Sequence, residues 1–133
     1  MKLTIESAIN IHAGLKQLDS YERAIKDGER ERVVREFYKF GGGMRLLIAK
    51  NLNRLDIVVS TFQAARDGLV YEFSSDGKAE VLPEKMAAFG KAVRDLMIVE
   101  EEVELTRIKS DELKLDENPV PASTLSLLLP ILD

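Results

Sequence analysis

The stretch MRLLIAKNLNRLDIVVSTFQAARDGLVYEF, residues 44–73, decides the fold of this chain. Apolar side chains return in it every three or four residues, and one arginine fills the single gap. The series is Ile48, Leu52, Leu55, Val59, Phe62, Arg66, Leu69 and Phe73. This spacing places one apolar stripe along a long helix, and such a stripe needs a partner to cover it.

A second amphipathic stretch supplies that partner. Its series is Met86, Phe89, Val93, Leu96, Glu100 and Val103, with the glutamate in the gap. The polar run Ser74-Ser75-Asp76-Gly77 between the two stretches is typical of a turn. Helices joined by a short loop lie antiparallel. We therefore predict a long antiparallel helical hairpin, with helices over about 44–73 and about 84–104, the second opened by Pro83.

The N-terminal end predicts a small β element. Residues 1–5 alternate polar and apolar side chains, which favours a strand, and Ser7 then caps a short helix that reaches Asp19. A second strand is predicted near 104–109, where the composition resembles that of the first. We expect the two strands to pair, because short strands are unstable alone.

Short helices are predicted at the C-terminal end. A single helical turn begins at Ser110, and a last helix runs from Pro121 or Ala122 through Leu129, where Pro130 ends or kinks it. The fold class that follows is mainly α with minor β: a long antiparallel helical hairpin, short terminal helices and a small β element. We expect a single domain over residues 1–133.

Residues 20–43 are less regular. Residues 21–25 suit one more helical turn, Asp27-Gly28 suits a turn, and residues 32–40 favour extended structure over helix. That extended segment would join the small β element. The triplet 41–43, all glycine, belongs before the long helix or in its first turn, and a hinge explains it better than an anion site, since no P-loop residues follow.

Composition bounds the function. The formal net charge of −4 provides no positive field for nucleic acid. The absence of cysteine excludes disulfides and thiolate metal sites. No signal peptide is visible, and the apolar run 125–132 is too short to span a bilayer. We expect a cytoplasmic protein of the host cell, or one carried in a virion, with no membrane association.

Catalytic chemistry has little support. His12, the only histidine, lies among apolar residues and suits a structural role. Glu101 and Glu104 would share a helix face, so one alternative is a magnesium-dependent helical nucleotide hydrolase that uses the acidic cluster 100–104. Ion pairing with Arg45, Lys50 and Arg54 on the facing helix explains these acids better. We expect no enzyme, no cofactor and no metal.

A second alternative is a small nucleic-acid-binding protein. Its candidate residues are Arg30, Arg32 and Arg35. Asp27, Glu29 and Glu31 are interleaved with these arginines and largely cancel their charge, so a mixed solvated segment is the better interpretation. We expect nucleic acid not to be a partner.

Apolar residues off the two series suggest an interaction surface. They are Ile57 and Val58 on the first long helix, Ile98 on the second, and Leu125, Leu128, Leu129 and Leu132 in the C-terminal tail. These side chains either pack terminal segments within the chain or bind a second chain. We expect a non-enzymatic interaction or assembly protein that binds a protein partner or itself as a homo-oligomer.

Three features carry a family resemblance: the opening MKLTIESA (1–8), the central helical hairpin, and the closing run LKLDENPVPA (113–122). The chain resembles a family of small proteins encoded in phage and prophage genomes, typically among structural and assembly genes. The resemblance implies an interaction protein of the virion or of its assembly. It implies no activity and no site residue.

Overall fold

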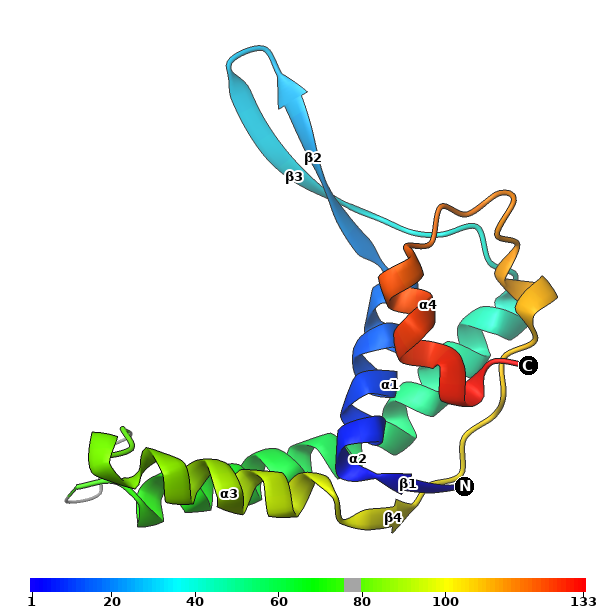
Figure 1. Cartoon of the computed structure of the whole chain (residues 1–133). Coiled ribbons are helices and arrows are strands. Elements are labelled where there is room, and N and C mark those ends of the chain that lie inside the picture. The colour runs from blue at the N-terminus through cyan, green and yellow to red at the C-terminus, as the bar shows by residue number, and fades with distance from the viewer. Residues whose placement is uncertain (76–79) are drawn as a thin grey trace. The chain divides into compact units, whose positions relative to one another are not determined.

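The computed structural model describes residues 1–75 and 80–133, which form helices and two small sheets (Figure 1). The strands are β1 (Lys2–Thr4), β2 (Tyr21–Asp27), β3 (Arg30–Glu36) and β4 (Glu100–Glu102). The α-helices are α1 (Ile5–Asp19), α2 (Gly42–Glu72), α3 (Met86–Met97) and α4 (Ala122–Leu128). The prediction of a mainly α fold with minor β is confirmed.

The described residues form two compact units. Unit 1 contains Met1–Ile9 and Arg54–Val103, and unit 2 contains Asn10–Asn53 and Glu104–Asp133. Both α1 and α2 contribute residues to each unit. A single domain over residues 1–133 stays a prediction.

Unit 1 contains the first sheet, in which β1 pairs antiparallel with β4. Backbone bonds continue beyond the strands, because the N–H of Val103 donates to the carbonyl of Met1 and that of Ile5 to Val99, both at 2.9 Å. Leu3, Ile5 and Val103 are buried. The sequence placed the partner of the N-terminal strand near 104–109, and this position is wrong. In that segment the structure describes only an isolated bridge, from Ile108 to Leu132.

The partner strand lies earlier because α3 ends at Met97 and not near residue 104. Ile98 and Val99 are β-branched and favour extended structure. The glutamates that follow would add negative charge to the negative end of a helix. In β4 two of them meet cations instead: Glu100 lies 3.7 Å from Lys2 Nζ, and Glu102 lies 2.9 Å from the N-terminal amine.

Unit 2 contains the second sheet, the hairpin of β2 and β3. Asp27 pairs with Arg30 across a two-residue turn. Gly28 has a φ of 68°, and positive φ at the first central position is where a type II′ turn takes glycine. The predicted turn and the extended structure up to Glu36 are confirmed. The helical turn predicted at 21–25 is wrong, and so is the predicted pairing of the extended segment within 32–40 with the small β element, because β3 pairs with β2.

The core of unit 2 joins α1, α2 and α4. It includes Ile11, Leu15 and Leu18 of α1 and Ile48 of α2, all at most 2% exposed. The predicted final helix is confirmed as α4, and the predicted turn at Ser110 is a 3₁₀ turn over Ser110–Leu113. Residues after α4 pair back onto the chain, because the N–H of Ile108 donates to the carbonyl of Ile131 at 2.8 Å.

The starts of α1 and α2 can be compared with their predicted positions. α1 begins at Ile5, and the N–H of Ser7 donates to Thr4 Oγ1 at 3.1 Å. Thr4 therefore caps this helix, and the predicted cap at Ser7 is wrong. α2 begins at Gly42, which confirms that the glycine triplet lies at the start of the long helix.

Candidate interaction surface

The end of α2 and the start of α3 meet through two aromatic rings. Phe73 and Phe89 pack edge to face, with ring centroids 6.2 Å apart. Ser74 bridges to Val81, and the N–H of Leu82 donates to the carbonyl of Phe73 at 3.2 Å. A 3₁₀ turn over Pro83–Lys85 then leads into α3, which begins at Met86, whereas the sequence predicted an α-helix from about residue 84. The turn predicted at Asp76-Gly77 lies outside the described residues.

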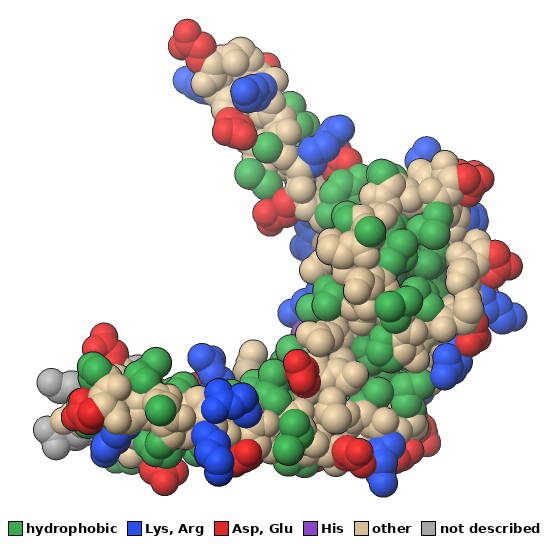
Figure 2. Space-filling view, viewed as in Figure 1, with side chains coloured by type: hydrophobic (Ala, Val, Ile, Leu, Met, Phe, Trp, Pro, Cys, Tyr) green, Lys and Arg blue, Asp and Glu red, His purple; other side chains and the backbone are tan. Residues whose placement is uncertain are grey.

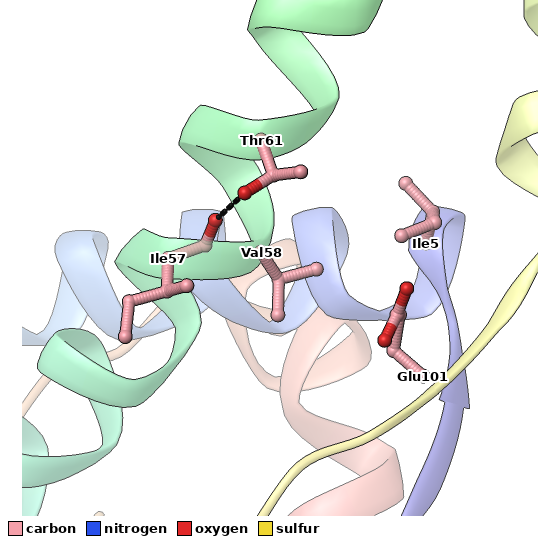
Figure 3. Close-up of a pocket in the computed structure, with 5 residues that line it drawn as sticks. All are labelled: Ile5, Ile57, Val58, Thr61 and Glu101. Carbon is pink, nitrogen blue, oxygen red and sulfur yellow. Dashed lines mark hydrogen bonds between the residues drawn. The ribbon is translucent and has the colours of Figure 1, made fainter.

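A small hollow of about 130 Å³ lies beside α2 in unit 1 (Figure 3). Its lining residues are Ile5, Ile57, Val58, Thr61 and Glu101. The hydroxyl of Thr61 donates to the carbonyl of Ile57 at 2.7 Å, the dashed line in Figure 3. Because this polar group is satisfied within the helix, a guest would meet aliphatic side chains and one carboxylate.

Two further hollows adjoin the first. One is lined by Ile5, Thr61, Phe62, Ala65, Leu96, Val99 and Glu101. The other is lined by Ile9, Val59, Phe62, Gln63, Arg66, Val93 and Met97. The first two hollows share Ile5, Thr61 and Glu101, and the last two share Phe62, so we refer to the three together as the α2–α3 groove. Phe62 and Val93 are half-buried on helices and line the same hollow, so these two members of the predicted apolar series do face a common space.

Ile57, Val58 and Val99 line this groove, and Ile98 precedes Val99 in the sequence. Ile57 is 70% exposed, Ile98 is 68% exposed and Val99 is 45% exposed, whereas Val58 is half-buried. Figure 2 shows hydrophobic side chains between charged ones along the part of unit 1 that α2 and α3 form. Single exposed apolar residues are ordinary, but several beside an apolar groove are typical of an interaction site.

Glu101 places a negative charge in the groove. Successive residues of a strand point to opposite sides, so Glu100 and Glu102 reach their cations on one side and Glu101 lies on the other. There its carboxylate lies beside Ile5 at the wall of the hollow (Figure 3). The groove is therefore mostly apolar, with the carboxylate of Glu101 in two of its hollows and the guanidinium of Arg66 in the third.

The apolar C-terminal tail is divided between core and surface. Leu128 is fully buried in unit 2, where its side chain lies against Gly14 of α1. Leu125 and Leu132 are half-buried, and Leu129 is 64% exposed. Of the predicted tail residues, Leu129 offers the most surface to another molecule.

The premises of the two alternative functions are not met. Glu101 lies in β4 and Glu104 follows it outside any helix, so the prediction of two carboxylates on one helix face is wrong. Among residues 1–75 and 80–133 no group of three His, Cys, Asp or Glu side chains could hold a metal ion. Arg30 and Arg32 lie on one side of β3, whereas Arg35 lies on the other, where its Nε donates to Ser20 Oγ at 2.7 Å.

Two sequence expectations can be placed on the structure directly. His12 is buried in α1, at 9% exposure, where a structural histidine was expected. Within the part of the chain that the structure describes, no helix combines the length and the apolar character that crossing a bilayer requires.

Sequence reasoning missed several residues of the groove. The sequence pattern places Ile5 in the small β element and Val99 among the apolar residues of a second long helix, and it gives no signal for Thr61. The available signal was the pair of β-branched residues Ile98-Val99 before three glutamates, which marks a helix end. Comparisons of the chain with protein-family models, with curated proteins and with solved structures give no match.

Proposed function

We propose that this chain is a non-enzymatic interaction or assembly protein of a phage or prophage, and that its α2–α3 groove binds another protein. One observation carries the proposal: Ile57 and Val99 line an apolar groove and are 70% and 45% exposed. Burying a large aliphatic side chain contributes about 2 kcal/mol. Covering both by a partner would therefore supply a useful part of a binding free energy.

The proposal includes an antiparallel hairpin of α2 and α3 as the rigid support of this surface. The edge-to-face pair of Phe73 and Phe89 supports it at the turn, and the shared hollow of Phe62 and Val93 supports it along the helices. A groove held by two helices changes little in shape when a partner binds, so little ordering entropy opposes association.

The chemistry of the groove describes its partner. An amphipathic helix would place aliphatic side chains in the hollows, as helices do in other apolar grooves. A lysine or arginine of the partner would meet Glu101, and an aspartate or glutamate would meet Arg66, which favours a partner helix with charges of both signs. The exposed Leu129 in unit 2 adds a second contact to the proposal, in the C-terminal segment.

Substitution of the exposed aliphatic pair tests the proposal. The chain and an Ile57→Ser, Val99→Ser double variant would be purified from the native host, and the proteins retained on each would be identified. We expect the double variant to lose its partner, with at least about a tenfold drop in affinity, because residues central to an interface dominate its energy.

The matched control is Leu46→Ser. Leu46 also lies on α2 and is 56% exposed, but it does not line the groove. We expect it to retain the partner, and circular dichroism should show the same helix content in all variants. Equal retention of the partner by the double variant and the parent chain would overturn the proposal.

A further inference from the structure

The β2–β3 hairpin has two open strand edges. Each strand has seven residues, and no other described strand pairs with either one. The side chains are mostly exposed along both strands, with Val33 at 64%. An edge of this kind carries backbone donors and acceptors that a further strand can use.

The register shows which backbone groups are available. In a two-residue hairpin the pair beside the turn, Asp27 and Arg30, is hydrogen-bonded, and such pairs alternate with pairs that are not. Val33 lies opposite Ala24 in a pair of the second kind. Its N–H and carbonyl therefore point away from β2, as do those of Glu31 and Arg35.

The sequence of β3, RERVVRE, is complementary in charge to its own reverse about the middle residue, Val33, except that Arg32 lies opposite Val34. With Val33 opposite its own copy, Glu31 lies opposite Arg35 of the second copy, and Arg30 lies opposite Glu36. Each pair occurs twice by symmetry, so four pairs of opposite charge flank a central pair of valines. We propose that β3 pairs antiparallel with β3 of a second copy, which joins two hairpins into a four-stranded sheet.

This register is preferred over its neighbours. Centring on Arg32 places that arginine against its own copy, which repels. Centring on Val34 keeps one kind of charge pair, between Arg32 and Glu36. The edge of β2 offers less, because centring on Ala24 pairs only Glu22 with Lys26 and brings two alanines together. Charges on an edge usually prevent pairing, but in the preferred register every charge of β3 except that of Arg32, which lies opposite Val34, meets its opposite.

Arg35 also has partners within its own chain. Its guanidinium lies 3.9 Å from Asp19, and its side chain remains 66% exposed. It can therefore face Glu31 of a second copy without leaving these contacts. The inference does not depend on the α2–α3 groove.

Two proline variants test the strand edge. Val33→Pro removes an N–H that points outward and leaves the bonds between β2 and β3 in place. Ala24→Pro makes the same change on the same rung of the hairpin, at the opposite edge. A paired edge of seven residues is small, so self-association would be measured by sedimentation up to about 1 mM. We expect dimers of the parent chain and of Ala24→Pro, and a monomer for Val33→Pro.

A charge exchange provides a second, independent test. Glu31→Arg places two arginines opposite each other, and Arg35→Glu places two glutamates opposite each other, so each variant alone should be monomeric. Mixed, they restore every pair and should form a heterodimer that weakens with salt. A parent chain that stays monomeric, a dimer that persists in Val33→Pro, or a mixture that does not associate would overturn the inference. If both proline variants are monomeric, the mixture of the two charge variants decides between the inference and a general loss of hairpin structure.

Discussion

Asn51 and Thr106 exchange two hydrogen bonds in unit 2, as paired residues do in an antiparallel sheet. Asn51 Nδ2 donates to the carbonyl of Thr106, and the N–H of Thr106 donates to Asn51 Oδ1, both at 2.9 Å. Asn51 is fully buried, although it lies on a long helix among apolar residues. The side chain of Asn51 thus satisfies both backbone hydrogen-bonding groups of Thr106, which lies outside the strands and helices.

We predict that Asn51→Ala lowers the free energy of unfolding by about 2 kcal/mol, because both backbone groups of Thr106 lose their partners. Urea denaturation followed by circular dichroism measures this. Asn53→Ala is the matched control, since Asn53 is exposed on the same helix and the change in helix propensity is the same. Equal effects of the two substitutions would show that the hydrogen bonds contribute little.

Gly14 gives a second prediction. A Cβ at this position would lie 2.9 Å from Leu128 Cδ2 and 3.1 Å from Leu127 Cβ, closer than carbon atoms pack. We expect Gly14→Ala to destabilise the chain by about 1–3 kcal/mol despite the better helix propensity of alanine, because α4 must move. The melting temperature reports the change.

Gly68→Ala is the control for that prediction. Gly68 lies inside α2, and a Cβ there would meet nothing within 4 Å. We expect this substitution to stabilise the chain by about 0.5–1 kcal/mol, through the unfolded state and the helix propensity. Opposite signs at the two glycines would establish that the contact with α4, and not the residue type, decides the outcome.

The parts of the fold that the sequence predicts well are those with local causes. The apolar period of residues 44–73 predicts α2 to within two residues at its start, where the structure begins at Gly42. The final helix also follows from its flanking prolines and its short apolar run. These signals act within one turn of a helix, so a single sequence contains them.

The parts that fail depend on distant segments. Glu100 could continue a helix, but it pairs with Thr4 of β1 instead. The residues near position 100 do not indicate that the N-terminal strand is their partner. The groove depends on the same event, because it includes Ile5 and Glu101. The hairpin of β2 and β3 is different. The pair Asp27-Gly28 predicts its turn, but the strand before the turn resembles a helical turn in sequence, because polar and apolar side chains alternate only weakly along it.

Tyr21 gives a prediction that depends on pH. Its hydroxyl donates to Glu36 Oε2 at 3.0 Å, and this hydrogen bond raises the pKa of the Tyr21 phenol above the ordinary value of 10.0. The raised pKa stabilises the fold below pH 10, and the contribution is lost as the pH rises through the folded-state pKa. Tyrosinate absorbance should show Glu36→Gln bringing the pKa down toward 10.0. Glu22→Gln, on the opposite side of the strand, should leave it unchanged.

Adjacent leucines in the C-terminal tail should behave in opposite ways. Leu128 is fully buried in unit 2, and Leu129 is 64% exposed. We predict that Leu128→Ala costs about 2–5 kcal/mol of unfolding free energy, from lost burial and the cavity that remains. Leu129→Ala should change it by less than about 0.5 kcal/mol, as substitutions on an open surface do. Denaturant midpoints of both variants measure this. If the tail instead served only to bind another chain, both substitutions would leave the isolated chain equally stable, and the packing of Leu128 against Gly14 would have no energetic role.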